Sequence, residues 1–398
     1  MLDRDHCLAL DAGDPLREFK DEFVLPEGVV YLVGNSLGAL PRRTAERVRR
    51  AVADEWGKEL VGGWNTEGWY EQPLTLGDRL APLIGAGPGQ VVVGNTTSIA
   101  IYQAVAAALR LRPERRVIVS DVRNFPTDHY MVQGLAGLLG DYEVRDVAAG
   151  GFEDAAVVLL GEVDYGTGAR HDVPSVTAEV RAAGALMVWD VCHSVGAMEV
   201  DISAADFGVG CTYKYLNGGP GAPAFLYVNP RHHAAAENVL SGWMGHAEPF
   251  AFEADYRPAE GVRRFAVGTP HVLSMAALEA ALDMWERVPM GQVRAKSMAL
   301  TSLFIDLVGD ALEPASPLDA AARGSQVSFR HPDGYRVMRA LIDRGVHGDF
   351  RAPDILRFGI APLYIGYADV YDAAATLLEV LDQELWQDER YAHRRGVT

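Results

Sequence analysis

Lys214 has the setting of a lysine that could hold an aldehyde. It lies between Tyr213 and Tyr215 and directly before the glycine-rich turn at residues 218–221. A lysine amine forms a Schiff base with an aldehyde, which is a common use of lysine in covalent catalysis. Alone, however, a lysine before a glycine turn is usually a solvated surface residue. The interpretation therefore depends on what the rest of the chain places near it.

Asp190 and His193 follow a continuous apolar run at residues 186–189. A carboxylate directly after a buried strand is costly unless a cation accompanies it. A protonated pyridine nitrogen would be such a cation, and a histidine three residues on could stack over the ring or orient it. The plainer interpretation, an aspartate at a helix start and a core histidine, stays open from these residues alone.

A hydroxyl-rich turn, Gly94-Asn95-Thr96-Thr97-Ser98, follows the apolar residues 91–93. Backbone N–H groups at a helix start, with hydroxyl donors added, can bind a phosphate. The same residue types are also ordinary N-caps, which is their more frequent role. The turn lacks the glycine spacing and the Gly-Lys-Ser/Thr ending of a Walker A loop.

These three features occur in the order turn, aspartate, lysine, each at the end of an expected strand. Open α/β sheets bind ligands at the carboxyl ends of their strands. Taken together, the order predicts a pyridoxal phosphate site. In it the turn holds the phosphate, Asp190 holds the ring nitrogen and Lys214 holds the aldehyde.

Short apolar runs alternate with helical stretches between residues 90 and 230, as in a mostly parallel sheet with helices on both faces. Strands are expected at residues 91–93, 117–119, 144–147, 156–160 and 186–189, with helices at 97–110, 127–139 and 174–183. Residues 57–73 are rich in glycine and tryptophan and are expected to form a loop. Later, strand-like runs at 326–329 and 355–358 lie between helices near 333–344 and 367–387, which predicts a smaller α+β domain.

The domain limits expected from this pattern divide the chain into three parts. Residues 1–60 form an N-terminal segment that packs with the small domain, 61–275 form the large α/β domain that binds the cofactor, and 276–398 form the small domain. The fold class is therefore α/β.

Composition excludes several classes of partner. The 398 residues are 49% hydrophobic and 23% charged, with a formal net charge of −18. This charge argues against nucleic acid or an anionic membrane as the main partner. The three cysteines match no zinc spacing, so no metal is expected, and they fit a reducing compartment. No signal core or membrane-length apolar run is seen, so a cytoplasmic location is expected.

Several stretches resemble the kynureninase family, in particular its bacterial type, within the fold-type I pyridoxal-phosphate enzymes. The most specific are Asn124-Phe125-Pro126-Thr127-Asp128 and the Tyr-Lys-Tyr-Leu-Asn-Gly-Gly run that contains Lys214. The matching stretches are residues 31–38, 95–98, 124–128, 190–196, 212–219 and 348–364. The resemblance implies a homodimer whose active site is shared across the subunit interface.

The resemblance also implies a role for individual residues. Around the cofactor ring these are Lys214 as the covalent anchor, Asp190 on the ring nitrogen, Phe125 stacked on the ring, and Asp128 and His193 in its hydrogen-bond shell. The phosphate would be held by Thr96, Thr97, Tyr213 and Trp243, with Trp243 a candidate to come from a partner subunit. Arg357 would bind the substrate carboxylate, which suits a bidentate guanidinium. The aromatic end of the substrate would be surrounded by Ser36, Trp64 and Thr269, the last also bordering the cofactor.

The implied activity is hydrolysis of the Cβ–Cγ bond of L-kynurenine to anthranilate and L-alanine, in tryptophan catabolism. Lys214 would act as general base and acid at Cα, and Tyr213 would either relay a proton or hold the phosphate. Trp64 and Thr269 replace a histidine and an asparagine of the animal-type enzymes. This replacement favours kynurenine over 3-hydroxykynurenine, the other candidate substrate.

Three alternatives to this activity differ in how well the sequence supports them. A related lyase could act on a modified kynurenine in secondary metabolism. A cysteine desulfurase-like enzyme is disfavoured because the chain has no cysteine after Cys211. A cofactor-free binding protein is disfavoured because Lys214, Asp190 and Arg357 are all present.

Two positions depart from the family pattern. Gly161 occupies a place where relatives often have a serine or threonine near the cofactor, so one hydrogen bond is expected to be missing or supplied by water. Val33 replaces a residue that is commonly more polar. Trp64 and Arg357 also have plainer interpretations, as a core aromatic and as a surface ion-pair residue.

Overall fold

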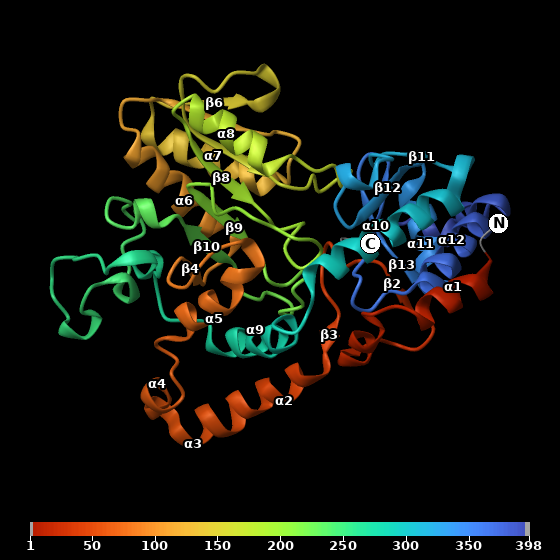
Figure 1. Cartoon of the computed structure of the whole chain (residues 1–398), viewed down its shortest axis with the longest axis horizontal. Helices are drawn as coiled ribbons and strands as arrows, with labels where there is room; N and C mark the ends of the chain where they lie inside the picture. Colours follow the sequence, from red (N-terminus) through yellow and green to blue (C-terminus); the bar gives the residue numbers. More distant parts are fainter. Residues whose placement is uncertain (1–2, 395–398) are drawn as a thin grey trace.

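The computed structural model describes residues 3–394. Two parts lie side by side, each built around its own sheet, and a helical arm runs beneath them (Figure 1). Within the described residues no helix is both long and apolar enough to cross a membrane.

The larger part is built on a seven-stranded sheet. Its order is β4-β10-β9-β8-β7-β5-β6, and all neighbours are parallel except β10, which is antiparallel to β4 and β9. The strands are β4 (Val91–Val93), β5 (Val117–Ser120), β6 (Glu143–Asp146), β7 (Ala155–Gly161), β8 (Leu186–Asp190), β9 (Phe207–Gly210) and β10 (Phe225–Val228). Every residue of β4, β7, β8 and β9 is buried, which explains their unbroken apolar sequences.

Helices cover both faces of this sheet, and successive strand residues enter different cores. Met187 and Trp189 belong to one hydrophobic cluster, whereas Val188 belongs to the other. The helices that supply the cluster of Val188 are α6 (Thr97–Leu111) and α7 (Pro126–Leu139). Those that supply the other cluster are α5 (Gln72–Leu80), α8 (Val173–Ala182) and α9 (Val272–Trp285). The predicted α/β fold class is confirmed, with most element ends within one or two residues of expectation.

The smaller part contains a four-stranded antiparallel sheet of order β11-β12-β15-β14. Its strands are β11 (Glu313–Pro314), β12 (Gln326–Arg330), β14 (Asp349–Arg351) and β15 (Ile355–Gly359). Its helices are α10 (Met290–Val308), α11 (Gly334–Ile342) and α12 (Tyr367–Asp382). Phe304 of α10 packs edge-on against Phe329 and Phe358 of the sheet, with ring centroids 5.9 and 4.9 Å away. These aromatic contacts join the helix layer to the sheet.

The N-terminal segment packs against this smaller part. It contains α1 (Arg4–Ala12), β1 (Phe23–Val24), β2 (Val30–Tyr31) and β3 (Leu40–Pro41), and β2 pairs in parallel with β13 (Val346–His347). Helix α1 lies against α12, and the Asp11 carboxylate accepts hydrogen bonds from the Tyr367 and Ala368 N–H groups at the start of α12. A buried ion pair of 2.6 Å joins Asp14 to Lys296 of α10. The two ends of the chain are therefore held together.

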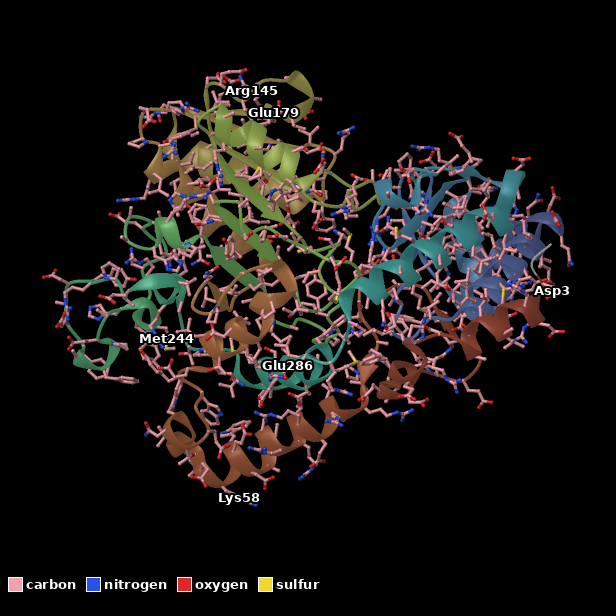
Figure 2. All side chains as sticks on the ribbon, viewed as in Figure 1. Asp3, Lys58, Arg145, Glu179, Met244 and Glu286 are labelled. Atoms are coloured by element: carbon pink, nitrogen blue, oxygen red, sulfur yellow. The ribbon has the colours of Figure 1, made fainter. Side chains whose placement is uncertain are left out.

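A helical arm extends from the N-terminal segment along the edge of the molecule (Figure 1). It consists of α2 (Arg42–Arg50), the π-helix Ala51–Trp56, α3 (Gly57–Glu59) and α4 (Gly63–Thr66). The expectation of a loop at residues 57–73 was wrong, because these residues form short helical turns and the first residues of α5. Gly63 allows this, since a Cβ there would lie 2.5 Å from the Trp69 ring. Figure 2 shows Lys58 pointing away from the body at the outer end of the arm.

Candidate active site

A cavity of about 370 Å³ opens beyond the carboxyl ends of the parallel strands, on the side where β14 and β15 approach the large sheet. Ten of the predicted site residues line this main pocket, in agreement with the placement of ligand sites in open α/β sheets. They are Ser36, Thr96, Thr97, Phe125, Asp128, Asp190, His193, Tyr213, Lys214 and Arg357.

Lys214 and His193 meet in the pocket. The Lys214 Nζ atom lies 2.9 Å from His193 Nε2. His193 is only 7% exposed, and burial followed by the positive charge of Lys214 lowers its pKa well below the ordinary value. A neutral imidazole accepts a hydrogen bond from the lysine amine. His193 can therefore hold the Nζ atom in place without adding a second positive charge beside it.

Two buried carboxylates, Asp190 and Asp128, lie close together on the same wall. Asp190 Oδ1 accepts from the Cys192 N–H at 2.8 Å, and Asp128 Oδ2 accepts from Asn124 Nδ2 at 2.7 Å. The Asp128 Oδ1 atom has no partner within the described residues. Burial, and then the charge of Asp190, raise the pKa of Asp128 well above its ordinary value. The pair therefore offers a cationic ligand group the oxygens of Asp190, beside Asp128, a carboxyl group that holds a proton more readily than usual.

The hydroxyl-rich turn is also the start of a helix. Thr96 is the N-cap of α6, and its side chain accepts from the Ile99 N–H at 3.4 Å. The capping role is thus real, yet Thr96, Thr97 and Ser98 still line the pocket. The Ser98 and Thr127 hydroxyls are 2.6 Å apart, which links the starts of α6 and α7. A helix N-terminus with these hydroxyls is a suitable anion site.

Phe125 and Tyr213 add aromatic walls to the pocket. Phe125 precedes Pro126 at the first position of α7 and is 43% exposed, so one ring face is open to a ligand. Its ring meets the Tyr165 ring edge-on at 5.5 Å. Burial raises the pKa of Tyr213, which keeps its hydroxyl protonated and able to donate a hydrogen bond.

Arg357 is a buried residue and not a surface ion-pair residue. It is 1% exposed on β15, and Asp349 accepts from its Nε at 2.6 Å and its Nη2 at 2.5 Å. Its Nη1 atom donates to the Tyr165 carbonyl oxygen. A guanidinium held this firmly can present its remaining N–H groups to a carboxylate in a fixed orientation.

These residues fit pyridoxal phosphate. Asp128 Oδ1 has no hydrogen-bond partner within residues 3–394 and feels the charge of the neighbouring Asp190, so a protonated ring nitrogen would give this pair of carboxyl groups a cation. Lys214 can reach an aldehyde, and the α6 start can take a phosphate. Within the same residues, no cluster of three or more His, Cys, Asp and Glu side chains has a metal-binding arrangement.

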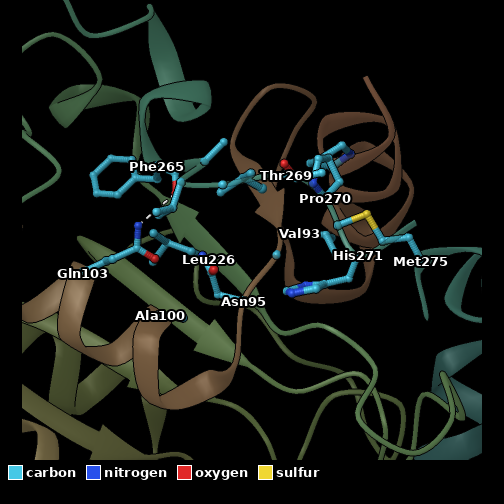
Figure 3. Close-up of a pocket in the computed structure, with 16 residues that line it drawn as sticks. Val93, Asn95, Ala100, Gln103, Leu226, Phe265, Thr269, Pro270, His271 and Met275 are labelled. Carbon is cyan, nitrogen blue, oxygen red and sulfur yellow. Dashed lines mark hydrogen bonds between the residues drawn. The ribbon is translucent and has the colours of Figure 1, made fainter. Parts of the chain in front are cut away.

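Three predicted residues lie outside the main pocket of this chain. Trp64 and Trp243 pack edge to face, with ring centroids 6.3 Å apart. Thr269 borders a separate small cavity, where Figure 3 shows it across from Asn95, the residue before Thr96. The structure of one chain does not bring these three residues to Lys214.

Several pocket residues received no role from the sequence. Asn35, Thr127 and Arg351 all line the pocket. Each lies inside a stretch that resembled the family, so the motifs marked the right segments without distinguishing which side chains face inward. Gly161 lies directly against the Asn124 side chain, because a Cβ on residue 161 would be 2.9 Å from Asn124 Nδ2. The Asn124 amide occupies the space in which a larger residue would stand.

Comparison with known proteins places this geometry in context. The family described as Kynureninase C-terminal domain matches residues 293–377. A kynureninase of Burkholderia pseudomallei is 49% identical over the full length of both chains. A kynureninase of Deinococcus radiodurans is 52% identical, with 96% of this chain and 97% of that protein aligned.

Solved structures show the same fold at much lower sequence identity. A cysteine desulfurase from Thermococcus onnurineus superposes with a TM-score of 0.76 at 20% identity, covering 92% of this chain and 98% of that chain. The Escherichia coli cysteine desulfurase CsdA gives a TM-score of 0.75 at 18% identity, covering 93% and 98%. At these identities the likeness concerns the fold alone.

Proposed function

This chain belongs to the kynureninase family, and on that premise we propose that it hydrolyses L-kynurenine to anthranilate and L-alanine, as a step of tryptophan catabolism. The family is dependent on pyridoxal phosphate and cleaves a carbon–carbon bond. The observation that carries the proposal is the arrangement of Lys214, Asp190 and Arg357 around a single cavity. These three groups are what an amino acid substrate and this cofactor together require.

Each part of the cofactor has a residue suited to hold it. Lys214 would hold the aldehyde carbon, Asp190 the ring nitrogen, and Phe125 would pack on the ring. The start of α6 with Thr96 and Thr97 would hold the phosphate. When bound, pyridoxal phosphate supplies an electron-withdrawing ring that stabilises negative charge at the substrate's Cα.

The chain's own residues then bind the substrate and move protons. Arg357 fixes the α-carboxylate, which orients the Cα–H bond toward Lys214. The Lys214 amine removes the proton at Cα and later returns one, acting as base and then as acid. His193, kept neutral by burial, accepts a hydrogen bond from Nζ and so keeps the amine in reach. One water is consumed, its oxygen entering the anthranilate carboxylate.

A cysteine desulfurase activity is not favoured by this site. That reaction needs a nucleophilic thiolate, and the pocket contains one cysteine, Cys192. Cys192 is 4% exposed, and burial raises its pKa well above the ordinary value. It is therefore a protonated thiol in a packed wall and not a nucleophile.

We also propose a homodimer in which each subunit supplies residues to the partner's site. Apolar side chains near Trp64 and Trp243 are open to solvent in the single chain: Val61, three residues before Trp64, is 81% exposed, and Phe252, which lines one cavity with Trp243, is 83% exposed. Large exposed apolar groups beside an incomplete site favour coverage by a second copy.

The three free thiols agree with a cytoplasmic location.

Substrate preference belongs to the same proposal. Trp64 and Thr269 are expected to surround the ring of the substrate and, in place of a histidine and an asparagine, to favour a ring without a 3-hydroxyl group. The test is anthranilate fluorescence released from kynurenine, compared with turnover of 3-hydroxykynurenine and ring-halogenated kynurenines. The proposal expects the larger kcat/KM for kynurenine. Absence of anthranilate release by the cofactor-loaded enzyme would refute the function, and a larger kcat/KM for 3-hydroxykynurenine would refute the preference.

A further inference from the structure

Asp349, Arg351 and Arg357 project from one face of the paired strands β14 and β15. Asp349 and Arg351 are two residues apart along β14, so they point to the same side. Asp349 stands directly opposite Arg357 in the antiparallel register. The strand geometry therefore places an arginine, an aspartate and a second arginine together at the wall of the main pocket.

Both guanidinium groups meet the same carboxylate oxygen. Asp349 Oδ2 lies 2.5 Å from Arg357 Nη2 and 3.1 Å from Arg351 Nη2. Arg357 has five N–H groups, and the bonds to Asp349 and Tyr165 use three of them. One N–H on Nη1 and one on Nη2 therefore stay available. Arg351 is held more loosely, through Asp349 and a 3.0 Å bond to the Phe350 carbonyl oxygen.

The group carries one positive charge more than its carboxylate can balance. Asp349 is 4% exposed and Arg357 is 1% exposed, so this excess charge is poorly solvated. The pKa of Arg351 is lowered by burial and then by repulsion from Arg357. A bound carboxylate would complete an alternating set of two cations and two anions, and would relieve that repulsion.

Arg351 lies where two cavities meet. It lines the main pocket together with Arg357, and it also lines a neighbouring cavity of about 500 Å³. Its side chain is 33% exposed, so it is accessible from the outer cavity while Arg357 is not. An arriving carboxylate therefore meets Arg351 at the mouth and Arg357 at the back of the same site.

We propose that the substrate carboxylate is bound by a clamp of two arginines, Arg357 and Arg351, and that Asp349 is the positioning residue that sets their relative orientation. The clamp rests on the proposed function, because it takes an amino acid as the ligand of this pocket. The clamp assigns a binding role to Arg351. It also explains why the buried Asp349 carboxylate lies beside Arg357, which must bind the carboxylate of the substrate.

The test compares ligands with and without a carboxylate. The cofactor-loaded enzyme is titrated with L-alanine and with ethylamine, which is alanine without its carboxyl group, and the dissociation constant is read from the cofactor absorbance. In Arg351→Gln we expect the dissociation constant for L-alanine to rise about tenfold and that for ethylamine to stay unchanged. Asp349→Asn should weaken L-alanine binding at least as much, and Arg351→Lys should recover part of the loss.

Arg330→Gln is the matched control. Arg330 lies on the same sheet, pairs with Asp354 at 3.0 Å and lines the outer cavity, but it does not line the main pocket. The Arg330→Gln variant should bind L-alanine and ethylamine as the wild type does. Unchanged L-alanine binding in Arg351→Gln would overturn the clamp. Equal weakening of both ligands in Asp349→Asn would show that Asp349 supports the fold and does not position the arginines. Failure of the proposed function would appear separately, as absent anthranilate release from the wild type.

Discussion

Lys214 Nζ and His193 Nε2 lie 2.9 Å apart, although 21 residues separate them in the chain. They meet because β8 and β9 are parallel neighbours, so the segments that follow the two strands leave the sheet at the same edge. The histidine follows β8 and the lysine follows β9. The parallel sheet thus turns two distant sequence positions into one hydrogen-bonded pair in the main pocket.

His193 should make the stability of the cofactor-free protein depend on pH. Burial lowers its folded-state pKa below the unfolded value of about 6.5. Below pH 6.5 the unfolded chain therefore binds a proton that the folded chain does not, and stability falls as pH falls. The contribution of one such group approaches about 1.4 kcal/mol per pH unit below 6.5.

The measurement is urea unfolding of the wild type and of His193→Asn between pH 5 and 8. Subtracting the two curves removes groups of opposite sign, such as Asp128, whose raised pKa favours the folded state in acid. The difference in unfolding free energy should be constant above pH 6.5, and should change below it in favour of the variant. A difference that is flat across the whole range would contradict a buried neutral His193.

Lys214→Ala should remove both the covalent link to the cofactor and the acid–base group. We expect kcat to fall by roughly 10³-fold or more, because proton transfer by a positioned side chain alone contributes about 10²–10⁴-fold. Borohydride reduction should no longer attach the cofactor covalently to the protein, which is read from the mass of the reduced protein. Lys58→Ala is the control, since Lys58 is exposed on the arm and should leave both properties intact. Undiminished activity in Lys214→Ala would exclude this lysine as the reactive amine.

The large sheet could be predicted from the sequence because its strands are apolar on both faces. Residues such as Val188 and Trp189 must each enter a core, and a sheet covered by helices on both faces explains an unbroken apolar run. Once the strands were predicted, the pocket residues that directly follow them could be predicted too, because open α/β sheets bind ligands at the carboxyl ends of their strands. The helical turns between residues 57 and 73 were missed because they are stabilised by packing of Trp69 on Gly63 and not by a periodic pattern. Arg351 was missed because only the register of β14 with β15 shows which side it faces.

Gly161→Ser should weaken cofactor binding, although the family resemblance implies that a hydroxyl residue can stand at this position. A Cβ on residue 161 would lie 2.9 Å from Asn124 Nδ2, the atom that donates to Asp128 at 2.7 Å. Displacing the amide breaks this buried bond, at a cost of about 1–1.5 kcal/mol, or roughly tenfold in the dissociation constant of the cofactor. The dissociation constant is measured by fluorescence titration of the cofactor-free protein with the cofactor. Gly134→Ser is the matched control, because a Cβ at that glycine meets no atom within 4 Å. Tighter binding in Gly161→Ser would mean that the new hydroxyl replaces the asparagine contact.

The positions of Trp243 and Lys214 lead to the remaining prediction. Trp243 is 38% exposed and contacts Trp64 and Phe250, with ring centroids 6.3 and 5.8 Å away, and it does not line the pocket of its own chain. If it binds the phosphate in the partner's pocket, each active site combines Lys214 of one chain with Trp243 of the other. Trp243→Ala should then be poorly active through weakened cofactor binding, while its own Lys214 stays intact.

Mixing two impaired variants distinguishes a shared site from a site within one chain. When Lys214→Ala and Trp243→Ala subunits are dissociated and reassociated in equal amounts, about half of the dimers carry one of each. In a shared arrangement, such a dimer has one site with both native residues and one site with neither. Activity should therefore return to about a quarter of the wild-type value, because half of the dimers have one of two sites restored. If both residues acted within one chain, every site would lack one of them and mixing would restore nothing. The control is Lys214→Ala mixed with itself, which should stay inactive under either arrangement.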